Sequence, residues 1–138
     1  MKLAFMPILR CATPAETLAV LASVTSATSP TSTGGTALFL FFGAEDPHTG
    51  ESWCPDCVTA DPVLRASIAK LRPDLTVYEC PVGQRSEWKN QPTHPYRLHP
   101  LMRLARIPTL LFIADGVERG RLVEADCANP AAVAAFLA

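Results

Sequence analysis

The chain has 138 residues, of which 49% are hydrophobic, a size and composition that suit one compact domain over residues 1–138. Its formal net charge is −1, and it has no basic run or interleaving of basic and aromatic residues, which argues against nucleic-acid and anionic-membrane partners. Five cysteines are an odd number in a chain too large and hydrophobic to depend on a disulfide scaffold, so we expect a reducing, cytoplasmic location.

The first residues share some features with a secretory signal, because Lys2 precedes an apolar stretch and the small residues at 22–29 imitate a cleavage site. Pro7 and Arg10 interrupt this stretch, and Glu16 lies in the next apolar segment, so no continuous hydrophobic region forms. We therefore expect no secretory signal. No segment is long enough to span a membrane.

The first predicted helix begins at Pro14 and ends near Thr25. Its apolar face comprises Leu18, Val20, Leu21 and Val24. Residues 26–35 are rich in Ser, Thr, Gly and Pro, which predicts a flexible loop. Residues 36–42 are hydrophobic and rich in Phe, and this run predicts a fully buried strand that Gly43 ends.

Two cysteines separated by two residues follow this strand, in the sequence Trp-Cys-Pro-Asp-Cys at 53–57. Pro55 predicts the start of a helix, since the first-turn amides of a helix have no partners and proline lacks the amide hydrogen. Cys54 is then at the helix N-terminus, where free amides and the positive end of the helix dipole favour a thiolate. Cys57 lies one turn further, within reach of Cys54. This arrangement predicts a dithiol suited to thiol–disulfide exchange.

The remaining elements complete an α/β pattern. The helix that begins at Pro55 is predicted to end near residue 71, with a core face of Val58, Leu64, Ile68 and Leu71. Further strands are predicted at 75–78, 109–114 and 121–124, and further helices at 96–105 and 130–138. This order favours a central mixed β-sheet with helices on both faces.

Several segments together carry a family resemblance. They are the insertion 43–52, the motif 53–57, Asp61-Pro62, Val-Tyr-Glu-Cys-Pro-Val-Gly at 77–83 leading to Trp88-Lys89, Ile107-Pro108-Thr109, and Leu-Val-Glu-Ala-Asp-Cys at 122–127. In these residues the chain resembles the thioredoxin superfamily, and its Pro-Asp motif interior is similar to the thioredoxin domain-containing protein 17 family. The resemblance covers roughly residues 7–138 and implies a thioredoxin-like fold.

The resemblance also implies a monomeric disulfide reductase, in which Cys54 attacks a substrate disulfide and Cys57 then releases the reduced substrate. Electrons are expected to come from NADPH through thioredoxin reductase, with no cofactor bound to this chain. Family members act on small or selected disulfides, and the insertion 43–52 is a plausible cause of that selectivity. Asp56 opposes thiolate formation by its charge and is expected to tune the site, either by carrying the proton of Cys57 or by complementing the helix dipole alone.

The resemblance implies that Trp53, Pro55, Ile107 and Pro108 contact the substrate. Pro108 matches a cis-proline that faces the cysteines in thioredoxin-like folds, and it is expected to leave the backbone of Ile107 free to pair with an extended substrate. The alternative is an ordinary trans proline that begins a strand. Trp53 is expected to form a flat wall beside Cys54 or to belong to the core, and the two roles are compatible.

Many thioredoxins bury an aspartate in the strand before the motif, but residues 36–42 contain no carboxylate. The proton acceptor for Cys57 is therefore water, Asp56 or another group. Cys80 and Cys127 match family cysteines outside the motif, and we expect buried, inert thiols, with a regulatory disulfide as the alternative. Cys11 has no assigned role.

Two alternative functions belong to other classes. In a metal-binding module, Cys54 and Cys57 would be joined by two residues from the set Cys80, Cys127, His94 and His99. The two histidines are five residues apart with prolines among them, which does not suit the close second ligand pair of a structural zinc site, so we expect no metal. The other alternative is a redox-regulated binding or scaffold protein of thioredoxin fold.

Overall fold

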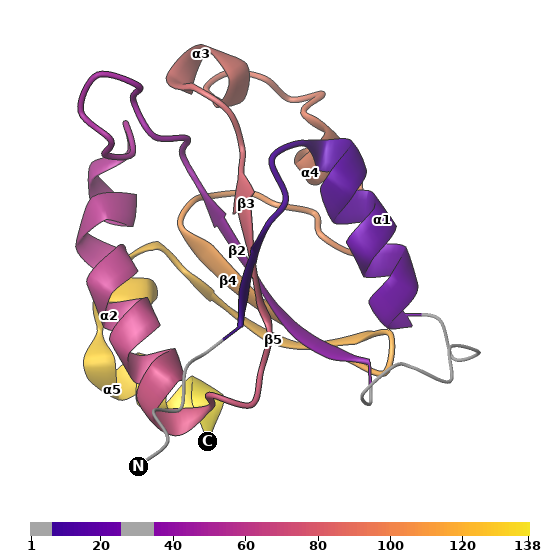
Figure 1. Cartoon of the computed structure of the whole chain (residues 1–138). Coiled ribbons are helices and arrows are strands. Elements are labelled where there is room, and N and C mark those ends of the chain that lie inside the picture. The colour runs from indigo at the N-terminus through magenta and orange to yellow at the C-terminus, as the bar shows by residue number, and fades with distance from the viewer. Residues whose placement is uncertain (1–6, 26–34) are drawn as a thin grey trace.

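The computed structural model describes residues 7–25 and 35–138 (Figure 1). The strands are β1 (Ile8–Arg10), β2 (Thr36–Phe42), β3 (Val77–Pro81), β4 (Thr109–Ala114) and β5 (Val117–Val123). The helices are α1 (Pro14–Thr25), α2 (Pro55–Leu71), α3 (Arg85–Trp88), α4 (Pro95–Leu98), the 3₁₀ turn η1 (Glu124–Ala128) and α5 (Pro130–Leu137). The strands form one sheet in the order β1-β3-β2-β4-β5, with β1, β3 and β2 parallel and β4 and β5 antiparallel.

Strand β2 lies at the centre of the sheet and is buried on both faces. Phe39 and Phe41 pack into one core cluster with Leu21 of α1, whereas Leu38 and Leu40 pack into a second cluster with helices α2 and α5. Figure 1 shows the corresponding layers, with α1 and α4 on one side of the sheet and α2 and α5 on the other. A strand covered on both faces needs apolar side chains at successive positions, which accounts for the continuous hydrophobic run. The α/β class predicted from the sequence is confirmed.

Strands β2 and β4 and helix α2 have the bounds predicted from the sequence, and α1 begins and ends at the predicted residues. Most of the predicted loop at 26–35 lies outside the described residues, whereas Gly35 occupies a turn with a positive φ of 58°. Among the described residues, no helix combines the length and the hydropathy that a membrane crossing requires.

The predicted core face of α2 is wrong at two positions. The buried residues of α2 are Cys57, Ala60, Leu64 and Ile68. Val58 and Leu71, which were expected in the core, are 37% and 43% exposed. The helix therefore presents to the sheet the face that contains Cys57, and Val58 lies off that face. Leu71 follows Leu64 and Ile68 at helical spacing, but it is exposed because it is the last residue of the helix.

The long helix predicted at 96–105 is also wrong. Helix α4 ends at Leu98, because Pro100 has no amide to continue the hydrogen-bond ladder and disfavours helical backbone at His99. Strand β3 begins at Val77, two residues later than predicted, and β5 begins four residues earlier, at Val117. The short helix α3 was not predicted.

Candidate functional site

Cys54 is the N-cap residue of α2, at the C-terminal side of the central strand. Its backbone is extended, with φ −92° and ψ 110°, and Pro55 follows in the first turn. The sulfur of Cys54 accepts a hydrogen bond from the backbone N–H of Cys57 at 3.3 Å. The side chain thus occupies the position where Ser, Thr or Asp usually caps a helix, and a negatively charged cap is favoured there.

The two thiols of the motif form a buried, hydrogen-bonded pair. Both cysteines are free, and the sulfur of Cys57 donates to the sulfur of Cys54 over 2.6 Å. This hydrogen bond and the Cys57 backbone N–H outweigh the opposing effect of burial, and the pKa of Cys54 is lowered to about 7. The pKa of Cys57 is raised by its interaction with Cys54 and by burial. The site therefore contains one thiol that ionises near neutral pH and one that keeps its proton there.

Asp56 lies exposed in the first turn of α2, next to the pair. The negative charge of Asp56 raises the pKa of Cys54, and the backbone amide of Asp56 lowers it. Both effects on this pKa are smaller than those of the Cys57 thiol and of burial. The carboxylate therefore opposes the thiolate through a charge that water partly screens.

Substitution of Asp56 with asparagine is expected to lower the pKa of Cys54, because it removes a nearby negative charge. The rate of iodoacetamide alkylation at Cys54 should rise with pH with a midpoint near 7 in the unsubstituted chain. In Asp56→Asn the midpoint should fall, so that alkylation at pH 6 is about twofold faster. A midpoint that moves upward would show that Asp56 favours the thiolate.

Trp53 is the first residue of the motif 53–57, and its side chain is held by a hydrogen bond and by packing. Its indole Nε1 donates to the carbonyl oxygen of Gly83 at 2.8 Å, and the ring packs against the core cluster that contains Cys54. Gly43 lies directly against this ring, since a Cβ atom at Gly43 would be 2.6 Å from Cε2 of Trp53. The core role considered for Trp53 is therefore seen in the structure, and its role as a wall beside Cys54 stays a prediction.

Ser52 also belongs to the site, although the sequence analysis did not select it. Its hydroxyl donates to the carbonyl oxygen of Gly43 at 2.6 Å and accepts from the backbone N–H of Cys54 at 3.1 Å. The same hydroxyl interacts with Cys57 and lowers the pKa of that thiol, against the larger effects of Cys54 and burial. Serine side chains often accept a hydrogen bond from the backbone N–H two residues later. The position of Ser52 two residues before the N-cap Cys54 was therefore a sequence signal for this contact.

A cleft of about 290 Å³ borders the motif on the Cys57 side. Pro108 lines it together with the insertion 43–52, which contributes Glu45, Gly50, Glu51 and Ser52. The Ile107–Pro108 peptide bond is cis, and Ile107 is buried in the same core cluster as Cys54. The structure thus gathers the predicted residues of the motif and of the 107–108 loop in one region, while Pro55 and Asp56 lie exposed beside them.

Ion pairs hold the insertion and the cleft wall together. Arg65 of α2 pairs with Asp61 at 2.8 Å and with Glu79 of β3. Arg10 of β1 pairs with Glu45 of the insertion at 2.6 Å and approaches Glu79 at 3.6 Å. Two carboxylates and one guanidinium of this network, Glu45, Asp61 and Arg65, line the cleft, which therefore has a polar wall of mixed charge beside Cys57.

Other candidate residues have structural roles. Trp88 is buried and packs into the core cluster that contains Cys54, with the guanidinium of Arg97 at 3.6 Å from its ring centroid. His48 is exposed in the insertion. The Nε2 atom of His94 forms a hydrogen bond with the carbonyl oxygen of Val82. Its Nδ1 atom accepts from the backbone N–H of Tyr96, in the helix α4 that His94 caps. Within residues 7–25 and 35–138, no three His, Cys, Asp or Glu side chains are arranged to hold a metal ion.

A model of the thioredoxin domain of thioredoxin domain-containing protein 17-like proteins matches residues 20–138. The chain belongs to the thioredoxin domain-containing protein 17-like family. The resemblance seen in the sequence is therefore confirmed, and membership supports a redox role for the thiol pair described above.

One relative of this family member carries the family's name, and another is a longer protein with a different name. Thioredoxin domain-containing protein 17 of Epinephelus coioides is 36% identical over 93 residues, which cover 67% of this chain and 71% of the relative. An acireductone dioxygenase of Leishmania infantum is 42% identical over 86 residues, 56% of this chain, and the match spans only 25% of that protein. The matched part of the chain thus corresponds to about a quarter of the length of the acireductone dioxygenase.

The fold of this family member is also found in solved thioredoxins. Thioredoxin O2 of Arabidopsis thaliana in the oxidized state superimposes with a TM-score of 0.61 at 20% sequence identity, covering 94% of this chain and 93% of the other. The thioredoxin-like fold expected from the sequence is therefore confirmed.

Proposed function

We propose that the chain is a thiol–disulfide oxidoreductase that reduces small-molecule or selected protein disulfides through Cys54 and Cys57. The observation that carries this proposal is the hydrogen-bonded pair at the start of α2, in which Cys54 has a pKa of about 7 and Cys57 holds a proton. At pH 7 such a thiol is about half ionised, whereas an ordinary cysteine with a pKa near ~8.5 is only a few per cent ionised.

In the first step the Cys54 thiolate attacks one sulfur of the substrate disulfide. A bond forms between Cys54 and that sulfur, the substrate S–S bond breaks, and the other substrate sulfur leaves as a thiolate that takes up a proton. The negative charge of Cys54 is lost in this step. The effect that raised the pKa of Cys57 therefore weakens, and the Ser52 hydroxyl beside Cys57 favours its ionisation.

In the second step Cys57 loses its proton and attacks the sulfur of Cys54. The intramolecular disulfide forms, the mixed disulfide breaks, and the second substrate thiol leaves. The substrate has then gained two electrons and two protons, and the chain carries a Cys54–Cys57 disulfide. We propose that thioredoxin reductase returns this disulfide to the dithiol with electrons from NADPH, without a cofactor bound to the chain itself.

The insertion supports selectivity for small or accessible disulfides. Glu51 and Ser52 of the insertion line the same cleft as Cys57 and Pro108, so a substrate that approaches on this side must fit against the insertion. In our proposal Trp53, Pro55, Ile107 and Pro108 contact the substrate, and the backbone of Ile107 pairs with an extended segment when the substrate is a protein. We further propose that the chain works as a cytoplasmic monomer.

The proposal is tested by following NADPH oxidation with thioredoxin reductase and cystine or another model disulfide. Turnover that requires the chain, the reductase and the disulfide together would support the proposed reaction. If a chemical dithiol reduces the Cys54–Cys57 disulfide while no NADPH is consumed, the proposed electron donor is wrong. If the pair cannot be cycled between dithiol and disulfide at all, the oxidoreductase proposal is wrong.

A further inference from the structure

A second pair of cysteines lies across two neighbouring parallel strands. In the backbone register of the two strands, Arg10 of β1 lies opposite Glu79 of β3. The backbone N–H of the next residue, Cys11, donates to the carbonyl oxygen of Glu79 at 2.8 Å. This register places Cys11 beside Cys80. Neighbouring strands lie about 4.8 Å apart, which is within the range of Cα separations that a disulfide spans, about 4.4–6.8 Å.

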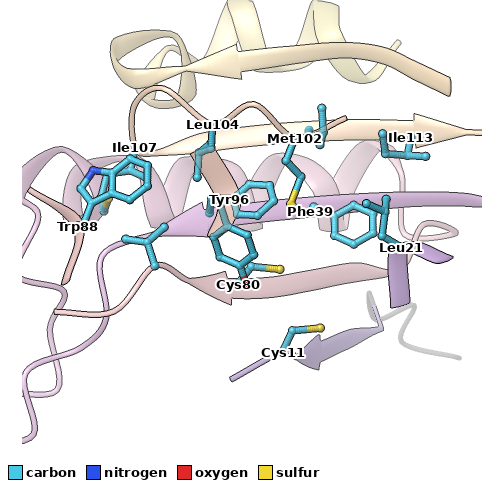
Figure 2. Packing of buried hydrophobic residues seen from close by; sticks show 14 of the residues in the cluster. Cys11, Leu21, Phe39, Cys80, Trp88, Tyr96, Met102, Leu104, Ile107 and Ile113 are labelled. Atoms are coloured by element: carbon cyan, nitrogen blue, oxygen red, sulfur yellow. The ribbon is translucent and has the colours of Figure 1, made fainter. Parts of the chain in front are cut away.

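The two thiols also lie on the same face of the sheet. Cys11 is 2% exposed and Cys80 is fully buried, and both belong to the core cluster that includes Tyr96. Figure 2 shows Cys11 and Cys80 on their adjacent strands, at the side of the sheet where Tyr96 and Phe39 pack. Thr17 of α1 lowers the pKa of both thiols, and its hydroxyl forms a hydrogen bond with the hydroxyl of Tyr96 at 2.6 Å. The pair is therefore a defined cluster and not two isolated thiols.

The two thiols have opposite acidities. The Cys80 thiol and, more weakly, Thr17 outweigh the effect of burial and lower the pKa of Cys11 to about 7. Burial and the interaction with Cys11 raise the pKa of Cys80. One thiol is thus the more reactive nucleophile and the other keeps its proton, the same division of roles as in Cys54 and Cys57.

An open cleft lies beside this pair. Strand β1 has three residues, all with exposed side chains, and among the strands of the described residues it is an edge strand that pairs with β3 alone. Ala12 and Pro81, the residues that directly follow Cys11 and Cys80, line an open cleft of about 420 Å³. Because Cys11 lies just past the end of β1, its backbone can shift with the loss of few hydrogen bonds.

From this geometry we propose that Cys11 and Cys80 form a second redox site, which hydrogen peroxide or another hydroperoxide oxidises to an intramolecular disulfide between β1 and β3. Cys11 attacks a peroxide oxygen, so that an S–O bond forms, the O–O bond breaks and the Cys11 sulfenic acid results. Cys80 then attacks the sulfur of Cys11, the S–S bond forms and water leaves. With hydrogen peroxide the two thiols lose two electrons and two protons, and two molecules of water are produced.

Oxidation at this site would tie the edge strand covalently to the interior of the sheet. The bond links residues that are far apart in sequence, and such a link restricts the unfolded chain strongly. The oxidised protein should therefore unfold at a higher temperature than the reduced protein, by about 5 °C, and dithiothreitol should reverse the shift. The site would sense peroxide independently of the Cys54–Cys57 pair.

The test uses the full chain with Cys54→Ser and Cys57→Ser, in which Cys11, Cys80 and Cys127 are the remaining cysteines. After hydrogen peroxide treatment, alkylation in denaturant and mass analysis of peptides should show Cys11 linked to Cys80, with Cys127 alkylated. Cys127 is a matched internal control, since it is as buried as Cys80 but belongs to the other core cluster, away from Cys11 and Cys80.

Adding Cys11→Ala to this variant should abolish both the linked peptide and the rise in unfolding temperature. Because Cys11 lies at the edge of the sheet, this substitution is the one that perturbs folding least. Alkylation of all three thiols after peroxide treatment would overturn the proposal. A disulfide that includes Cys127, or a bond between two molecules in place of the intramolecular one, would overturn it equally.

Discussion

Substitution of Cys54 with serine is expected to reduce disulfide turnover at least about 1,000-fold in the NADPH-coupled assay. A serine hydroxyl does not ionise near neutral pH, so the hydrogen bonds from the Cys57 backbone and thiol would have no thiolate to stabilise. The remaining Cys57 thiol cannot replace it, because it is only 4% exposed and its burial, which raises its pKa, persists when the interaction with Cys54 is lost.

The matched control is Cys11→Ala, which removes a buried thiol outside the motif. This variant should keep more than about half of the activity, since Cys11 does not touch the substrate in the proposed reaction. Equal losses in the two variants would indicate that removal of any buried cysteine damages the fold. Substantial turnover in Cys54→Ser would show that another group is the nucleophile.

Substitution of Leu64 with alanine is expected to lower the free energy of unfolding by about 3 kcal/mol. Leu64 is 1% exposed and packs from α2 into the core cluster that contains Leu38 and Leu40 of β2. The loss combines the transfer of the side chain with the cavity that it leaves. Denaturant unfolding at equilibrium measures this change directly.

Leu71→Ala is the matched control, because it makes the same chemical change on the same helix. Leu71 is 43% exposed, so we expect a loss of less than about 1 kcal/mol. The sequence analysis placed both leucines in the core. Similar losses for the two variants would favour that prediction over the helix orientation in the structure.

The sequence predicts an element well where a single physical requirement determines it. Strand β2 is buried on both faces, and its uninterrupted hydrophobic run gave the correct bounds. Helix α2 begins at a proline that suits the first turn, and its start was predicted correctly. The motif 53–57 likewise predicted that Cys54 would cap this helix, since the cap follows from local spacing.

Features that depend on tertiary packing were predicted less well. The face of α2 that meets the sheet is the one containing Cys57, and hydrophobic periodicity alone favoured Val58 in its place. The hydrogen bond from Ser52 to the carbonyl oxygen of Gly43 requires the insertion to close onto Gly43, whereas the hydrogen bond with the Cys54 backbone is local. The proximity of Cys11 to Cys80 depends on the register of two strands far apart in the chain.

The helix predicted at 96–105 shows a different cause of error. Periodic apolar residues were weighted above Pro100, whose missing amide and effect on the preceding residue end α4 at Leu98. Local backbone chemistry therefore decides this boundary, and it was already visible in the sequence.

The most direct test of the account is to trap the mixed disulfide on Cys54. A Cys57→Ser variant incubated with a disulfide such as cystine should accumulate a covalent adduct, because the attack by Cys54 can proceed and the release by Cys57 cannot. Peptide mass analysis should place one half of the substrate on Cys54, and the adduct should be absent from Cys54→Ser. An adduct on a different cysteine, or none under conditions where the unsubstituted chain reduces the disulfide, would contradict the assignment of Cys54 as the nucleophile.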